Sequence, residues 1–284
     1  MTYLGQVLKY KKTYKNWLSV ILSVMRQRDR NAIMRNGSII PTQFLSIQVK
    51  ELEARGMKPE YDKDADLLSF KYRGKPVKLN GTTLNGDIEG IFCDENYAFL
   101  DVNGKYVIDV GCNIGDSAIY FALNGAKKVL GYEPYPRVYV LAVENVRKMG
   151  LSDVISVINA GIGSENSHMQ IADLIETIAI PISTVQSGTE IPIISLNDVI
   201  SQIPSSDIML KMDCEGCEYD ALPKLEPENF RKLKKIVMEY HHGPETLVSL
   251  FKDMGYWCSA SEPVTTKRGP GKPYRIGYIK AERL

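Results

Sequence analysis

The sequence lacks an excess of charge of either sign, and it lacks long apolar runs. Its 284 residues include 35 Lys and Arg against 34 Asp and Glu. This balance gives no general attraction to a polyanion, so we expect no nucleic-acid partner. No stretch approaches the roughly 20 consecutive apolar residues that a membrane-spanning helix needs. The first residues, MTYLGQVLKYKK, also lack the uninterrupted apolar core of a secretory signal, so we expect a cytoplasmic protein.

Cysteines are few, odd in number and scattered, which is unlike a disulfide scaffold and favours a reducing compartment. The five are Cys93, Cys112, Cys214, Cys217 and Cys258. Cys214 and Cys217 form a C-x-x-C, but the chain has no second such pair and only three histidines to complete a zinc site. We therefore expect small cysteines packed in the core, with no metal site and no redox pair.

The N-terminal part of the chain predicts two accessory regions. Residues 3–30 carry apolar side chains at a three/four spacing, so residues 1–35 are predicted to be helical. We favour a helix docked on the body of the protein, with peripheral contact to a membrane surface or a partner as the alternative. Residues 36–104 contain short β-like pieces (68–72, 76–79 and 99–102) separated by turn signals, which predicts a small β-rich accessory region.

From Tyr106 onward, apolar runs alternate with segments of helical length. The runs are YVIDV, KVLGYE, VISVIN, DIMLKMD and KIVMEY. Runs of this kind are typical of strands buried on both faces of a parallel sheet. Residues 105–284 are therefore predicted to form an α/β, Rossmann-like, doubly wound and mostly parallel sheet. Residues 256–259 and 275–279 are expected to close it as an antiparallel pair.

The segment V-I-D-V-G-C-N-I-G-D ends a predicted strand and begins a helix near Asp116. Gly111 and Gly115 allow backbone to approach a ligand, and the helix N-terminus suits a carboxylate or phosphate. A dinucleotide-binding loop would carry a glycine where Asn113 stands. Asp109 disfavours a diphosphate and suits the amino group of a methionine moiety. These differences favour S-adenosylmethionine over NAD.

Two further groups of acidic residues follow predicted strands. Glu133 ends the second strand, where a carboxylate accepts hydrogen bonds from ribose hydroxyls in either cofactor class. Asp213 and Glu215 follow a later strand and are expected near the crevice that Gly111 borders. They are candidates for binding the cationic end of a cofactor, for a general base, for a metal site or for simple helix capping. His241 follows the last parallel strand and is a second candidate base.

Taken together, these motifs resemble those of the FkbM family of class I methyltransferases. The motifs in order are V-I-D-V-G-C-N-I-G-D, Y-E-P, N-A-G-I-G, S-L-N-D-V-I, K-M-D-C-E-G-C-E and V-M-E-Y-H. The resemblance implies a Rossmann-like core that uses S-adenosyl-L-methionine. By matching, it also implies three sets of site residues: Asp109, Gly111, Asn113 and Gly115 on the methionine part; Glu133 on the ribose; and Asn159, Ala160 and Gly161 near the adenine. Asp213 and Glu215 would lie beside the transferred methyl group. Cys112 and Cys217 replace the usual alanine, and Cys214 replaces a β-branched residue.

The resemblance implies methylation of a hydroxyl oxygen on a sugar, polyketide or similar small molecule. We favour a saccharide or glycolipid acceptor, because Tyr61, Tyr72 and Tyr97 could stack on sugar rings. We expect Asp213 or His241 to act as the base, with Glu215 organising its loop. The alternatives are a nicotinamide-dependent oxidoreductase and a non-catalytic nucleoside-binding protein on the same fold.

Overall fold

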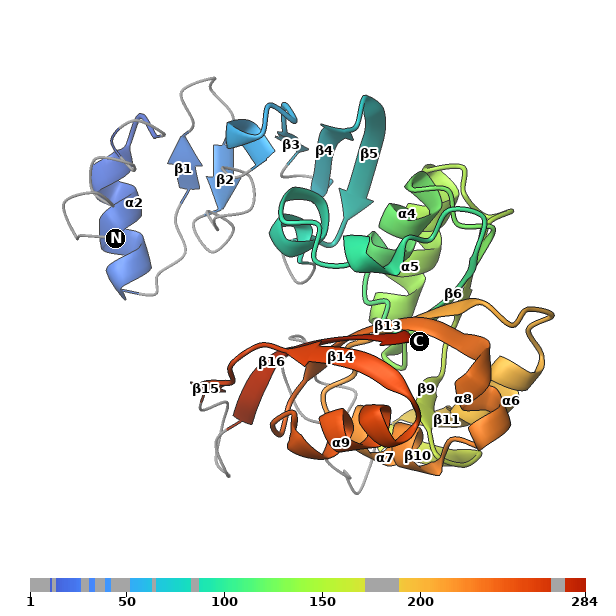
Figure 1. Cartoon of the computed structure of the whole chain (residues 1–284). Coiled ribbons are helices and arrows are strands. Elements are labelled where there is room, and N and C mark those ends of the chain that lie inside the picture. Colours follow the sequence, from blue (N-terminus) through green and yellow to red (C-terminus); the bar gives the residue numbers. More distant parts are fainter. Residues whose placement is uncertain are drawn as a thin grey trace. The chain divides into compact units, whose positions relative to one another are not determined.

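The computed structural model describes residues 11, 14–26, 31–33, 39–41, 52–62, 65–82, 87–171, 189–266 and 274–284. The chain divides into two compact units, Met1–Glu95 and Asn96–Leu284 (Figure 1). Among the described residues, no helix is both long enough and apolar enough to cross a membrane.

The described part of the first unit includes helix α2 (Trp17–Arg26) and short antiparallel strands. The strands are β1 (Asn31–Ile33), β2 (Ile39–Pro41), β3 (Glu60–Asp62), β4 (Leu67–Tyr72) and β5 (Lys75–Asn80). Strands β3, β4 and β5 form one antiparallel sheet, and a π-helical turn, η2 (Glu89–Cys93), follows. The Phe92 ring meets the Phe70 and Tyr72 rings edge-on, at centroid distances of 5.0 and 5.3 Å. The predicted helical region lies partly outside the described residues.

The second unit contains a large mixed sheet. Its strands are β6 (Tyr106–Val110), β7 (Lys128–Tyr132), β8 (Ile155–Ile158), β12 (Ile208–Met212), β13 (Leu233–Tyr240), β14 (Tyr256–Ala260), β15 (Val264–Thr266) and β16 (Tyr274–Arg283). The order is β14-β16-β13-β12-β6-β7-β8, with β15 paired to β16. The five strands from β13 to β8 are parallel, and β16 runs antiparallel to its neighbours. The predicted fold class and the closing antiparallel pair are therefore confirmed.

Helices and a smaller sheet connect these strands. They are η3 (Ala98–Leu100), α4 (Asp116–Leu123), α5 (Pro136–Lys148), α6 (Leu196–Ser201), α7 (Glu218–Ala221), η4 (Leu222–Lys224), α8 (Pro227–Lys232), α9 (Glu245–Asp253), β9 (Gly161–Gly163), β10 (Ser167–Ile171) and β11 (Thr189–Ser195). The predicted strand at residues 99–102 is wrong: η3 occupies its start, and the next residue, Asp101, has a left-handed φ of 47°. Extended backbone cannot continue through a residue in that conformation.

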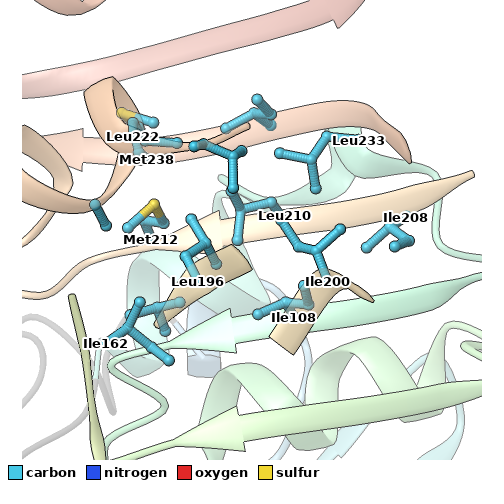
Figure 2. Close-up of a cluster of buried hydrophobic side chains, with 14 of the residues drawn as sticks. Ile108, Ile162, Leu196, Ile200, Ile208, Leu210, Met212, Leu222, Leu233 and Met238 are labelled. Atoms are coloured by element: carbon cyan, nitrogen blue, oxygen red, sulfur yellow. The ribbon is translucent and has the colours of Figure 1, made fainter. Parts of the chain in front are cut away.

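The core of the second unit forms where the sheet packs against its helices. Figure 2 shows Leu210 and Met212 of β12 among Leu196 and Ile200 of α6. All five residues of β12 are buried, as expected for a strand in the middle of a parallel sheet. One of those five is a lysine, Lys211, so this core strand carries a charge into the site described below.

The strand order creates a topological switch point between β6 and β12. From β6 the chain moves outward to β7 and β8, then returns to the other side of β6 to form β12 and β13. The loops that follow β6 and β12 therefore leave the sheet in different directions. Ligands of open α/β sheets bind in the crevice that such loops leave beyond the carboxyl ends of the strands.

Candidate active site

The loop after β6 is shaped by three left-handed residues. Gly111, Asn113 and Gly115 have φ values of 73°, 51° and 86°. A Cβ on Gly111 would lie 1.8 Å from the backbone oxygen of Asp213, and one on Gly115 would lie 3.3 Å from the backbone oxygen of Ala142. These glycines are therefore required by close packing within the chain, a reason that the sequence prediction did not include. The same contact brings Asp213 next to Gly111, as the sequence predicted.

Asp109 forms an ion pair with a lysine on the neighbouring strand. Parallel pairing places Asp109 of β6 beside Lys211 of β12. Lys211 Nζ lies 3.1 Å from Asp109 Oδ1, and Ser117 Oγ donates to Asp109 Oδ2 at 2.6 Å. The Asp109 carboxylate is fully buried, so the cation that it meets is Lys211. The ion pair argues against contact between Asp109 and the amino group of a ligand, and that role stays a prediction.

Lys211 also fixes the start of the glycine loop. Its ammonium group donates to the backbone oxygen of Gly111 at 2.6 Å and to that of Val110 at 3.2 Å. Burial opposes its charge, but Asp109 and Asp213 outweigh that effect and raise the pKa of Lys211. The sequence analysis missed this residue, although M-L-K-M and V-I-D-V place a charge at the same position of two core strands.

Glu133 and Asn159 organise the loop after β7. Glu133 Oε2 accepts from the backbone N–H of Asn113 at 3.1 Å, and Oε1 accepts from that of Tyr135 at 2.9 Å. Burial raises the pKa of Glu133 to about 7, although both N–H donors act in the opposite direction. The Asn159 amide donates to the backbone oxygens of Glu133 and Pro134 at 2.8 and 3.0 Å. Thus the structure brings Glu133, Asn113 and Asn159 together.

The remaining predicted cofactor residues border the same loops. Asp116 begins α4 and is 2% exposed, and its Oδ1 accepts from the backbone N–H of Ser117 at 3.0 Å. Ala160 is fully buried. Gly161 begins β9, where a Cβ would meet Ile193 Cδ1 at 2.6 Å. Ala160 and Gly161 therefore contribute backbone and little side-chain chemistry.

The loop after β12 contains a disulfide bond between Cys214 and Cys217. This corrects the prediction of separate core cysteines with no redox pair. A scattered, odd number of cysteines argues against a scaffold of long-range bridges, but it does not exclude a local one. Here Glu215 and Gly216, with φ values of 57° and 124°, turn the chain so that the two sulfurs meet. The free cysteines of the described chain are Cys93, Cys112 and Cys258.

His241 lies at the centre of a ring of carboxylates. Its Nδ1 is 2.8 Å from Glu218 Oε1, and its Nε2 is 3.5 Å from Glu215 Oε2. Asp213 Oδ1 and Glu239 Oε1 each lie 3.9 Å from Nε2. The side chains of His241 and Glu218 are buried, at 1% and 0% exposed, whereas those of Asp213, Glu215 and Glu239 are partly exposed. Four acids, from the loop after β12, the start of α7 and β13, thus surround a single imidazole.

The carboxylates keep His241 protonated. Burial opposes the charge, but the hydrogen bond to Glu218 and the charges of Glu218, Glu215 and Asp213 raise the pKa of His241 to about 9. A protonated imidazole cannot accept a proton, so this raised pKa argues against His241 as a base at neutral pH. Burial and the charge of Asp213 also raise the pKa of Glu239 to about 7. The sequence analysis gave no role to Glu218 or Glu239.

The comparison with known families decides the identity of this site. Residues 109–258, more than half of the chain, match the family described as the methyltransferase FkbM domain. The chain belongs to the FkbM methyltransferase family. It is therefore a methyltransferase that depends on S-adenosyl-L-methionine, as the motifs predicted.

Individual relatives are distant. The chain is 26% identical over 158 residues to uncharacterized protein 158B of Sulfolobus islandicus rod-shaped virus 1, which covers 56% of this chain and 74% of that protein. It is 37% identical over 65 residues to the ribosomal protein L11 methyltransferase of Vibrio vulnificus strain CMCP6, covering 23% of this chain and only 22% of that enzyme.

Solved methyltransferase structures are similar at low identity. One is the SAM-dependent methyltransferase from Agrobacterium tumefaciens, with a TM-score of 0.46, 11% identity and coverage of 77% of this chain and 71% of that one. Another is magnesium protoporphyrin IX methyltransferase from Synechocystis PCC 6803 with bound SAM, with a TM-score of 0.39, 13% identity and coverage of 67% and 77%.

Proposed function

We propose that this methyltransferase transfers a methyl group to a hydroxyl oxygen of a saccharide or similar small molecule, at the switch point between β6 and β12. The observation that carries the proposal is the excess of negative charge there. The carboxylates are Asp109, Glu133, Asp213, Glu215, Glu218 and Glu239, and the cations are Lys211 and His241. This field attracts a cationic sulfonium and repels a diphosphate, because like charges at short range raise the energy of a bound ligand.

The residues of the site fit the cofactor along its length. Glu133 is a buried acid that accepts hydrogen bonds from two backbone N–H groups, so its oxygens retain lone pairs for the ribose hydroxyls. The loop formed by Gly111, Asn113 and Gly115, with Asp116 at the start of α4, would hold the methionine part. Backbone at Asn159–Gly161 would border the adenine. S-adenosylmethionine itself supplies an activated methyl group on a positively charged sulfur.

Asp213 is the proposed general base. It adjoins Gly111, and its side chain is 33% exposed, more than those of Glu215, Glu218 or Glu239. A hydroxyl acceptor stays protonated at neutral pH, so a carboxylate that takes its proton during attack contributes roughly 10²–10⁴-fold to the rate. Protonated His241 would hold Asp213 and Glu215 in position without taking the proton itself.

The acceptor is supported by the acidic cluster and by the family resemblance, and no longer by the tyrosines. Tyr72 and Tyr97 are 1% and 4% exposed, and the hydroxyl of Tyr61 donates to Asp66 at 2.7 Å. The rings of Tyr72 and Tyr97 are buried within the chain, so they do not support stacking on a sugar. An oxygen acceptor remains the best match, because a hydroxyl needs a base and this site provides one.

Location and surface contacts remain proposals. Three free cysteines suit the cytoplasm, where thiols are kept reduced. Leu18 and Leu22 of α2 are 59% and 45% exposed and lie four residues apart, which is the spacing of one helix face. This face is the part of the predicted N-terminal helix that a membrane surface or a partner would contact.

The charge argument is tested by calorimetry with S-adenosylmethionine, S-adenosylhomocysteine and NAD. The first two differ by the methyl group and the sulfonium charge. Asp213→Asn should weaken binding of S-adenosylmethionine about tenfold, roughly 1.4 kcal/mol, with a smaller effect on S-adenosylhomocysteine. Glu133→Gln should weaken both by about 1.5–3 kcal/mol, because it removes the charge from bonds to the ribose.

Exposed Asp253→Asn serves as the matched control and should change neither affinity. NAD should not bind. Binding of NAD without S-adenosylmethionine would overturn the proposal. A methyl-labelled cofactor, incubated with the protein and an extract of the source cell, would then identify the acceptor.

A further inference from the structure

The Cys214–Cys217 disulfide lies inside the proposed methyl-transfer site. It closes a ring around Glu215 and Gly216, two of the left-handed residues in the loop after β12. Asp213 precedes this ring and Glu218 follows it directly. The bridge therefore sits between the proposed base and the carboxylate that holds His241.

A short chain of contacts links the bridge to His241. Cys214 Sγ lies 3.3 Å from Glu218 Oε2, which also accepts from the backbone N–H of Gly216 at 3.1 Å. The other Glu218 oxygen is bonded to His241, and the Glu218 side chain is fully buried. The other ring nitrogen of His241, Nε2, lies near carboxylate oxygens of Asp213, Glu215 and Glu239. Any change at the sulfurs therefore acts on residues that position the site.

The two sulfurs are within reach of a reductant. Cys214 and Cys217 are both half-buried, whereas Cys112 is 0% exposed. Thiol–disulfide exchange requires access of a thiolate to one sulfur, and a sealed core cysteine does not offer it. Because both cysteines are only half-buried, exchange at one of the two sulfurs is sterically open.

We propose that Cys214 and Cys217 form a thiol–disulfide exchange site for a dithiol reductant, and that its reduction lowers the rate of methyl transfer. This inference rests on the proposed function of the same site. A thiolate of the reductant attacks one sulfur and forms a mixed disulfide. Its second thiol then displaces the protein thiolate, so that two electrons and two protons pass to the chain. The products are two cysteine thiols and an oxidised, disulfide form of the reductant.

Reduction affects the site in two ways. The Cys214 thiol becomes an S–H donor directed at Glu218, so it shares the carboxylate that holds His241. The loop that the disulfide closes around Glu215 is also opened, so the left-handed backbone of this non-glycine residue is free to relax. Both effects displace carboxylates from the imidazole. A displacement near 1 Å is enough to slow a positioned reaction by on the order of a hundredfold.

The test uses the full chain, oxidised or treated with dithiothreitol under native conditions. Alkylation followed by peptide mass analysis should show modification of Cys214 and Cys217 only after reduction. NMR titration of the His241 ring, assigned with His241→Gln, should then show a lower midpoint in the reduced protein. Turnover should fall by about tenfold or more, and should recover on reoxidation. Affinity for S-adenosylhomocysteine should change little, because Glu133, the residue proposed to bind the ribose, lies outside the loop that the disulfide closes.

Two variants complete the experiment. Cys214→Ser/Cys217→Ser should be as slow as the reduced protein and should not respond to dithiothreitol. Cys258→Ser, at a free half-buried cysteine, should respond like the wild type. Loss of all cofactor binding or methyl transfer in the oxidised protein would refute the proposed function, whereas alkylation and NMR test the exchange site independently.

Three results would overturn the inference. The first is a bridge that resists the reductant until the chain unfolds. The second is reduction without any change in the His241 titration. The third is stoichiometric Zn²⁺ uptake by the reduced protein that blocks reoxidation. Within the described residues, Cys214, Cys217 and Glu218 have ligand atoms within 4.8 Å of one another, so that third outcome would identify a metal site.

Discussion

Glu133 shows how burial and hydrogen bonding compete at a single residue. Two backbone N–H groups stabilise its charge, yet removal from water dominates and raises its pKa to about 7. In the unfolded chain the same group would titrate near its ordinary value of 4.5. The folded protein therefore binds a proton on Glu133 over a pH range in which the unfolded chain does not.

This difference predicts a pH-dependent effect of Glu133→Gln on stability. Because the folded pKa is raised, the stability contributed by Glu133 is present below about pH 4.5 and is lost as the pH rises through about 7. The variant has no such loss, so its unfolding free energy relative to the wild type should rise by roughly 2–3 kcal/mol between pH 5 and pH 8. Urea unfolding at the two pH values measures this change. Exposed Glu228→Gln should show no such trend, and an equal trend in both variants would refute the explanation.

At the scale of elements, the register between β6 and β12 determines the electrostatics of the site. Parallel pairing sets Lys211 beside Asp109, one residue before the end of each strand. Both side chains are buried, so each needs the charge of the other. A shift of one residue in this register would place the two side chains on opposite faces of the sheet.

Lys211→Met should therefore be strongly destabilising. It leaves the Asp109 carboxylate buried without its cation, at an expected cost of about 3–5 kcal/mol in unfolding free energy. The double variant Asp109→Asn/Lys211→Met removes both charges and should recover most of that loss. Urea unfolding of the wild type and both variants provides the comparison. A double variant no more stable than Lys211→Met would show that pairing is not the cause.

At the scale of the whole molecule, residues 96–104 belong with the unit that carries the site. The sequence placed them in an accessory region of residues 36–104, whereas the compact unit begins at Asn96. Tyr97 packs against Phe121 at 5.8 Å, Leu100 is fully buried, and Asn103 forms a bridge with Ala126. The predicted three-part division into residues 1–35, 36–104 and 105–284 remains open to experiment.

Two truncated chains test the position of this boundary. Residues 96–284 should be more stable than residues 105–284 by at least about 3 kcal/mol, because the shorter chain loses the buried side chains of Tyr97 and Leu100. The longer chain should also bind S-adenosylmethionine, since every predicted site residue lies within it. Urea unfolding and calorimetry measure these two properties. Equal stabilities would favour a boundary at residue 105.

The sequence by itself determined the alternation of strands and helices and the place of the site along the chain. Apolar runs give buried parallel strands, and polar residues directly after such runs must lie at one edge of the sheet. Glu133, Asp213 and the glycine loop could be found for this reason. The sequence also showed Asn113 at the position where a dinucleotide-binding loop carries glycine, because that comparison depends only on the local motif.

Only the tertiary structure decided which of these residues face one another. The pairing of Asp109 with Lys211 depends on which strand lies beside β6, and the meeting of residues 213–218 with Glu239 and His241 depends on the pairing of β12 with β13. Burial then sets their protonation, because it removes water from the charged groups, and the sequence does not show which groups are buried. The Cys214–Cys217 bridge likewise required the left-handed turn at Glu215, a backbone conformation that residue type alone does not specify.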